Sequence, residues 1–230
     1  MFKPVAAPLA ILAFWGGMAA AAHAYRAGYD WRYQTISVLL YPDQNPHGYL
    51  WAWAGLELCG LAGFAWTAEL SRRLECAIAK PPATGLRLLQ MGFLCMCCAV
   101  LPDRLLPLPK GHEVFAIGAF LGICIGVTWQ MLVAVDSRES HRCRGTLARI
   151  RTIIRRVMPL LPLVPLLLAG STQAYLALER PNLPWVSPSW RTRGISPFLS
   201  FGLWEWMSCA VLSLCLLVLW DRRPAVADRQ

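Results

Sequence analysis

The feature that most constrains this chain is a series of six long apolar blocks separated by short polar connections. A helix needs about 20 apolar residues to cross the hydrocarbon core of a bilayer. The blocks predict membrane-spanning helices at 4–25, 48–70, 86–106, 112–135, 157–178 and 198–220. Because these spans use most of the 230 residues, we expect one all-α transmembrane domain over 1–230.

Composition agrees with a membrane protein and excludes several other classes. Hydrophobic residues make up 57% of the chain and charged residues only 15%, whereas about a quarter of a soluble domain is charged. A disordered, collagen-like or disulfide-scaffold protein is therefore excluded. The net charge of +9 comes from basic residues in short loops, which is typical of membrane topology signals, so we expect no nucleic-acid partner.

Two of the blocks carry features that bear on whether each forms a regular membrane-spanning helix. The first begins after Lys3 and ends near Ala22-His23-Ala24, which resembles a signal-peptide cleavage site. Its apolar run is longer than a signal sequence requires, so we interpret it as a helix. The fifth block contains Pro159, Pro162 and Pro165, which predict that its first turns are kinked or loosened.

The distribution of Lys and Arg predicts the orientation of the bundle. Fifteen of the 22 basic residues lie at the two ends of the chain and in the second and fourth connections. The side richer in short basic loops faces the cytoplasm. Both termini are therefore predicted to be cytoplasmic, in a plasma membrane or bacterial inner membrane.

This orientation predicts the outcome of cysteine labelling on intact cells. A cysteine introduced in place of Pro184, in the fifth connection, should react with an impermeant maleimide added outside. A cysteine in place of Arg144 should react only after the membrane is permeabilised. Labelling from outside at position 144 instead of 184 would show that the orientation is the opposite of the one predicted.

The fourth connection contains a basic amphipathic segment, TLARIRTIIRRV. Its apolar residues recur at helical spacing, and four arginines lie between them: Arg149, Arg151, Arg155 and Arg156. Such a segment is typical of a helix that lies on anionic lipid, so these arginines are lipid-binding candidates. The alternative is a simple topology anchor without lipid recognition.

Cysteine and histidine patterns give little support for redox or metal chemistry. Most of the nine cysteines lie inside apolar blocks, where thiols usually act as small hydrophobic groups. None lies in a predicted outer connection, so we expect no disulfide. The four histidines are scattered without a metal-binding spacing, so we predict no metal site and no cofactor.

Ionisable residues at the outer ends of the predicted helices are the candidate site. Charged groups in a bilayer are costly and are functional candidates by default. The candidates for a catalytic role are Glu57, Asp103, His112, Glu113 and Glu205. An imidazole above buried carboxylates suits acid–base chemistry, and His112 and Glu205 are predicted to approach within one water-bridged distance. The alternative is a purely structural network, for example with Arg26 or Arg32.

Three short motifs resemble one known family. The segments TISVLLYPDQNP, GHEVFAIGAFLGICIGVTWQML and WEW resemble the Frag/DRAM/Sfk superfamily of six-helix membrane proteins and its bacterial relatives. The family positions correspond to Ile36, Ser37 and Pro46, to His112, Gly118 and Ala119, and to Glu205 and Trp206. Glu113 and the proline-rich fifth helix depart from the family pattern.

The resemblance implies a role with membrane lipids, because members are linked to glycolipid-anchor remodelling, lipid asymmetry and autophagy. The leading hypothesis is lipid handling at the outer leaflet, by acyl transfer or ester hydrolysis. His112 would be the general base, Glu205 would orient it or act as acid, and Ser37 is a candidate nucleophile. The alternative is a non-enzymatic organiser, assembly factor or complex subunit that binds a membrane protein through the outer loops.

Overall fold

Helices form all the regular secondary structure in the part of the chain that the computed structural model describes, residues 5–77, 83–100, 111–136, 157–179 and 190–221. The α-helices are α1 (Ala6–His23), α2 (Ile36–Leu40), α3 (Tyr49–Ala77), α4 (Ala83–Val100), α6 (Gly111–Asp136), α8 (Leu163–Glu179) and α9 (Phe201–Asp221). Two 3₁₀ helices, η1 (Met158–Leu160) and η3 (Pro197–Leu199), precede α8 and α9. The all-α prediction is confirmed.

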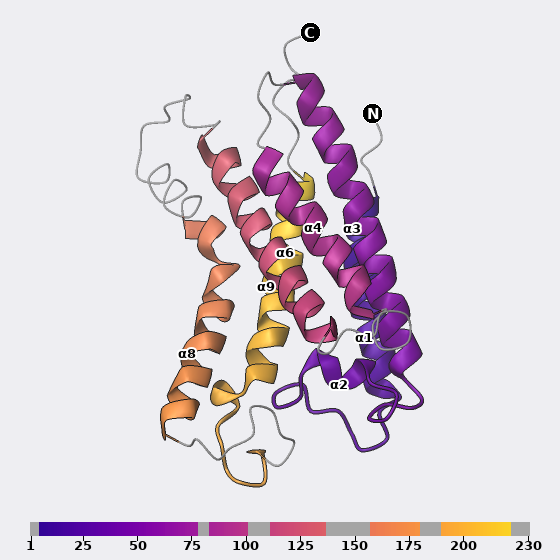
Figure 1. Cartoon of the computed structure of the whole chain (residues 1–230), viewed down its shortest axis with the longest axis vertical. Helices are drawn as coiled ribbons and strands as arrows, with labels where there is room; N and C mark the ends of the chain where they lie inside the picture. The colour runs from indigo at the N-terminus through magenta and orange to yellow at the C-terminus, as the bar shows by residue number, and fades with distance from the viewer. Residues whose placement is uncertain (1–4, 78–82, 101–110, 137–156, 180–189, 222–230) are drawn as a thin grey trace.

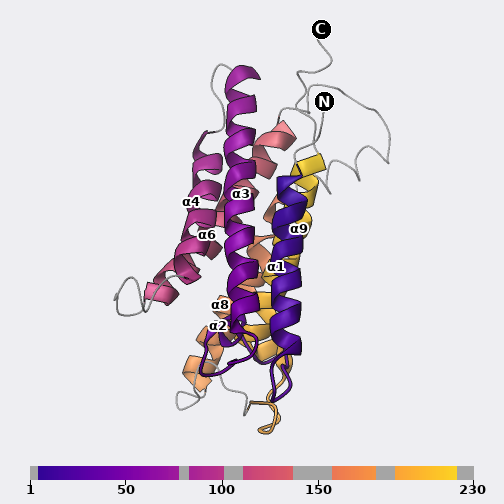
Figure 2. The same cartoon turned by 90° about the vertical axis from the view of Figure 1, so that its right-hand side faces the viewer.

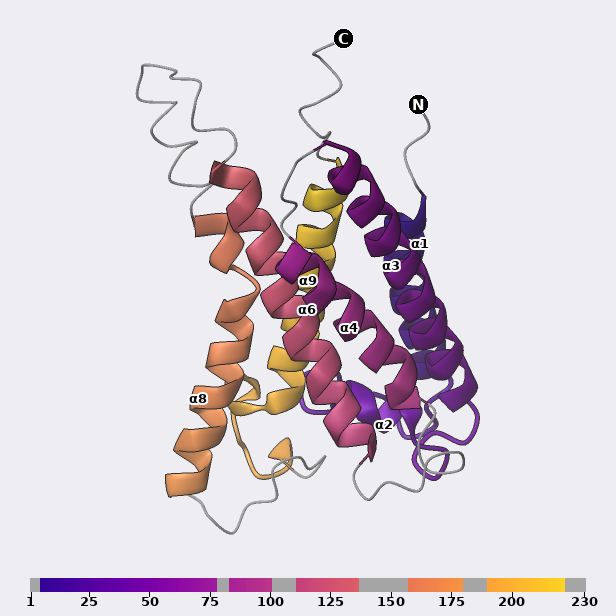
Figure 3. The same ribbon diagram turned by 45° about the horizontal axis from the view of Figure 1, so that its top comes forward.

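The six long helices run alternately up and down the bundle (Figure 1). The start of α1 and the end of α9 lie at one end, and α2 lies across the other (Figure 1). The most extensive contacts join α4 to α6, α1 to α3 and α3 to α4. Figure 2 shows α3 beside α1, and Figure 3 shows α8 at the margin, where it contacts α9 and α6.

Three of these helices are long and apolar enough to cross a membrane: Ala6–His23, Gly111–Val133 and Phe201–Trp220. Two shorter apolar stretches, Thr84–Ala99 and Leu163–Glu179, lie in α4 and α8. The remaining predicted span falls in α3, which has 29 residues but includes Glu57 and a polar second half. A helical membrane protein is thus supported, while six complete crossings remain a prediction.

Apolar side chains cover the outside of the bundle as well as its interior. In α6, Val114, Ile117, Leu121 and Ile125 are exposed and recur every three or four residues, which forms one stripe along the helix. Leu12 on α1 and Leu178 on α8 are 70% and 83% exposed. An apolar surface of this extent is unfavourable in water and is expected for helices that face lipid.

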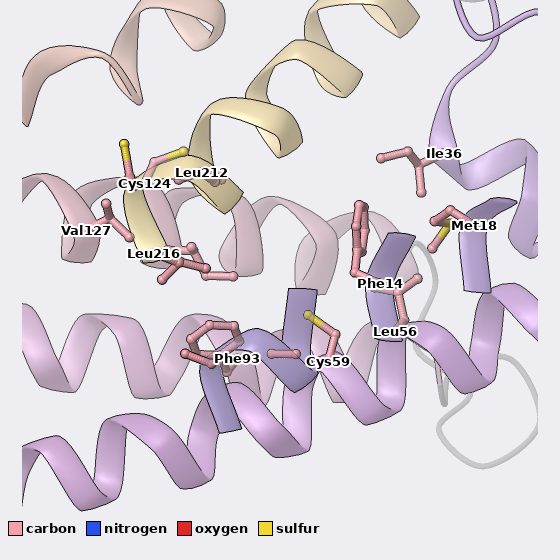
Figure 4. Packing of buried hydrophobic residues seen from close by; sticks show 14 of the residues in the cluster. Phe14, Met18, Ile36, Leu56, Cys59, Phe93, Cys124, Val127, Leu212 and Leu216 are labelled. Atoms are coloured by element: carbon pink, nitrogen blue, oxygen red, sulfur yellow. The ribbon is translucent and has the colours of Figure 1, made fainter. Parts of the chain in front are cut away.

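One hydrophobic cluster joins α1, α3, α4, α6, α9 and the short α2 (Figure 4). Phe14 and Met18 of α1 meet Leu56 and Cys59 of α3, and Phe93 of α4 is almost fully buried. Helix α8 packs against this cluster through Leu163 and contributes Leu176 to a smaller cluster with Tyr33, Trp190 and Ile195. The α2 end of the bundle is therefore tied to the same core as the long helices.

Glycines allow two helix pairs to approach closely. A Cβ atom on Gly17 of α1 would lie 2.6 Å from the Cα of Gly55 on α3. A Cβ atom on Gly122 of α6 would lie 2.8 Å from the Cα of Gly92 on α4. Such small-residue contacts are characteristic of membrane helices, where close backbone packing replaces the hydrophobic effect as a driving force.

The proline-rich start of the fifth block is irregular, as its sequence predicts. Pro159 lies in the 3₁₀ helix η1, and α8 begins only at Leu163. Proline lacks an amide hydrogen and therefore weakens the first turns of a helix. The structure also contains α2, a helix that the apolar pattern did not predict.

Candidate functional site

The connection between α1 and α3 folds over one end of the bundle and contains α2, whose two ends are held by side chains. At its beginning, the Ile36 amide donates to the Glu205 carboxylate of α9 at 2.8 Å. At its end, Trp53 Nε1 donates to the Leu40 carbonyl at 2.9 Å and Asn45 Nδ2 to the Leu39 carbonyl at 3.3 Å. These side chains satisfy helix-end groups that lack partners within the helix.

A buried polar network supports the chain just before α2. Trp206 Nε1 donates to the Tyr29 hydroxyl at 2.9 Å, and this hydroxyl donates to the carbonyls of Gln34 and Thr35. Burial raises the pKa of Tyr29 well above its ordinary value, so the phenol stays neutral and able to donate. The network fixes the approach of α9 to the chain that precedes α2.

Gly202 is required where α9 begins beneath this network. A Cβ atom at that position would lie 2.7 Å from the Gln34 carbonyl oxygen. Glu205 lies one helical turn further along α9, so close contact at Gly202 brings its carboxylate to the Ile36 amide.

His112, in the first turn of α6, is oriented by a backbone carbonyl. Its Nδ1 atom lies 2.8 Å from the Ala99 carbonyl oxygen of α4. Since a carbonyl can only accept, Nδ1 carries the hydrogen, and in the neutral ring Nε2 holds a lone pair. Nε2 is buried without a hydrogen-bond partner in the described part of the chain. The ring also packs edge-on against Tyr41, with centroids 5.5 Å apart.

An imidazole held in this way has the tautomer that a general base needs. A buried polar atom without a partner costs free energy, so its retention calls for an explanation such as a bound water, ligand or reacting group. Ser37 is half-buried on α2, and Tyr41, in extended conformation, directly follows that helix.

The structure gives His112 and Glu205 different immediate partners. The His112 ring meets Ala99 and Tyr41, whereas the Glu205 carboxylate meets the Ile36 amide. The two residues thus contact opposite ends of the segment 36–41. Their predicted approach within one water-bridged distance stays a prediction. The group that orients His112 through Nδ1 is the main-chain carbonyl of Ala99 and not the carboxylate of Glu205.

The other candidate residues from the sequence lie on α3 and α6 or fall outside the described residues. Glu57 is half-buried on α3 and hydrogen-bonds with Cys97 of α4. Glu113 is exposed on α6. Asp103 and the four arginines of the amphipathic segment lie outside the described residues. Among the described residues, no group of three or more His, Cys, Asp or Glu could hold a metal ion.

Sequence reasoning missed Tyr29, Tyr41 and Asn45, each of which lies in a turn-rich connection. Asn45 is 1% exposed, and its side-chain amide bridges Ala21 of α1 and Leu39 of α2. The only signal was the surrounding Pro-Asp-Gln-Asn-Pro composition, which predicts a defined turn without indicating its contacts.

The Glu205 contact predicts a difference between two substitutions. Glu205→Gln should nearly preserve stability, because an amide oxygen can still accept from the Ile36 amide. Glu205→Ala leaves that amide without an acceptor and should cost about 1–3 kcal/mol. Thermal unfolding in detergent measures both. Equal losses for Gln and Ala would show that the negative charge, rather than the hydrogen bond, stabilises this end of the bundle.

Comparisons of the chain with models of protein families, with curated protein sequences and with solved structures gave no match.

Proposed function

We propose that this protein is a six-helix membrane protein that transfers or hydrolyses acyl groups of phospholipids at the outer leaflet, with His112 as general base. The observation that carries the proposal is the orientation of the His112 ring: Nδ1 donates to the Ala99 carbonyl, and Nε2 is buried and unpartnered. The basic-loop distribution supports an outward-facing position for this end of the bundle.

The proposed chemistry begins with a proton transfer to Nε2 of His112. A water molecule, or the Ser37 hydroxyl, loses this proton as its oxygen forms a bond to the ester carbonyl carbon. The tetrahedral intermediate then collapses, the bond to the lysolipid oxygen breaks, and His112 returns the proton to that oxygen. With Ser37 as nucleophile, a second acceptor alcohol or water releases the acyl group by the same steps.

We also propose that the chain belongs with the Frag/DRAM/Sfk superfamily. The three motifs of that resemblance lie far apart in sequence, but their residues meet around α2. The Ile36 amide contacts Glu205, and Tyr41, directly after α2, contacts His112. These contacts bring residues of all three motifs together at one end of the bundle, which supports the proposal more than three isolated short motifs would.

The test uses the full chain purified and reconstituted in vesicles of phosphatidylethanolamine and phosphatidylglycerol with radiolabelled acyl chains. We expect labelled fatty acid, or a labelled acylated acceptor, to appear in proportion to protein and to depend on His112. If wild-type protein gives no product with these lipids, the catalytic proposal fails. The organiser or subunit role then becomes the better account.

A further inference from the structure

A second feature at the α2 end of the bundle lies apart from the residues that touch His112. It is a groove of about 490 Å³, open to the surface, in the turn between α1 and α2. Its lining is Ala27, Gly28, Tyr29, Asp30, Trp31, Arg32 and Arg191. Arg191 comes from the chain that leads to α9, so two distant segments form the groove.

The charged groups of the groove are arranged around a single carboxylate. Arg32 Nε and Nη2 donate to the two Asp30 oxygens at 2.9 and 3.0 Å, which is a paired, planar contact. Arg191 Nη1 lies 3.5 Å from Asp30 Oδ2. The Arg32 guanidinium keeps the pKa of Asp30 below its usual value, so the carboxylate is ionised at neutral pH. The three side chains together therefore carry one net positive charge.

This arrangement leaves oriented donors for an anion. A guanidinium has five N–H groups, and the side-on contact with Asp30 uses two of those on Arg32. The side chains of Arg32 and Arg191 are 45% and 68% exposed, so their remaining donors can reach a ligand. Because Asp30 holds the Arg32 fork in one orientation, less conformational entropy is lost when an anion binds.

Stability alone does not explain two exposed arginines on one carboxylate, since exposed ion pairs stabilise folded proteins little. Trp31, beside them in the lining, is 48% exposed. Exposed tryptophan at the end of an apolar bundle is characteristic of the headgroup layer of a membrane. Gly28 has a φ of +76°, and a Cβ there would meet nothing within 4 Å, so this turn stays open.

We propose that this groove binds the phosphate of an anionic phospholipid headgroup, with Arg191 and Arg32 as donors and Trp31 at the boundary with the acyl chains. The inference deepens the proposed function, because it assigns a lipid class to the same end of the bundle. It is a binding site and needs no turnover, so it can hold when the catalytic proposal fails.

The experiment titrates the full chain in a nonionic detergent with short-chain phosphatidylglycerol, and separately with phosphatidylcholine of the same chain length and with inorganic phosphate. Native mass spectrometry measures the bound fraction. We expect phosphatidylglycerol to bind the wild-type chain more tightly than the other two probes. Arg191→Gln should weaken that binding about tenfold or more, because a charge-assisted contact is lost.

Arg193→Gln is the matched control, since Arg193 is an exposed arginine two positions away that does not line the groove. It should bind phosphatidylglycerol as the wild type does. Tm values without lipid check that each variant is folded. Equal weakening by Arg191→Gln and Arg193→Gln would overturn the site in favour of diffuse charge attraction. Inorganic phosphate that binds as tightly as the lipid would overturn the lipid as ligand.

Discussion

Replacing His112 by asparagine is expected to lower phospholipid turnover by about 10²–10⁴-fold, the range attributed to general acid–base catalysis. The asparagine amide nitrogen takes a place close to that of imidazole Nδ1 and can donate to the Ala99 carbonyl. Nothing in asparagine replaces the lone pair of Nε2. The substitution therefore removes the proposed base and keeps the contact that joins α6 to α4. The measurements are labelled acyl release and Tm.

Two further variants separate chemistry from structure. His112→Ala removes both the base and the donor to Ala99, so it should lose activity and also some stability. His23→Asn is the matched control, because His23 is an exposed histidine at the end of α1. It should leave acyl release unchanged. Full activity of His112→Asn would contradict the role of His112 as base and leave its orientation as a packing feature.

The long helices could be predicted closely because their lengths and apolar runs are strong, local signals. The span expected at 112–135 is α6, Gly111–Asp136, and the span expected at 4–25 is α1, Ala6–His23. The prediction for 48–70 ended too early, because α3 continues through a charged turn to Ala77. Apolar runs indicate where a membrane begins and ends, but a helix continues into water as long as its backbone bonds are made.

Helix α2 could not be predicted, because five residues are too short to show a helical period. Its stability depends on tertiary contacts, since isolated helices of this length do not form in water. Those contacts come from Glu205 and Trp53, which lie 169 and 13 residues from their partners. Only the turn-rich composition around α2 was visible in the sequence.

Two side chains of the candidate site could be predicted from the sequence, but their partners could not. His112 and Glu205 stand out as ionisable residues in apolar blocks, which is a visible signal. Their partners in the structure are a carbonyl and an amide of the main chain, at Ala99 and Ile36. Every residue carries those groups, so no side-chain pattern can indicate which of them will be used.

The closest helix crossings predict the largest effects on stability. Gly17→Ala should destabilise the protein by about 1–3 kcal/mol, as overpacking of a tight interface does. The added Cβ would lie 2.6 Å from both the Gly55 Cα and the Trp51 carbonyl oxygen. These are main-chain atoms that cannot turn aside, so α1 and α3 must separate. Gly17→Leu should prevent their docking and abolish the folded protein. Thermal unfolding in detergent and the yield of monodisperse protein measure the two variants.

The preceding residue supplies the control on the same helix. A Cβ on Gly16 would meet nothing within 4 Å, because this position faces away from α3. Gly16→Ala should therefore leave Tm unchanged or raise it, since alanine favours a helix over glycine by up to about 1 kcal/mol. Gly16→Leu should also fold, with its side chain added to the lipid-facing surface. If the Gly16 and Gly17 variants lose stability equally, the loss is not specific to the α1–α3 crossing, and the close approach at Gly55 does not hold the bundle together.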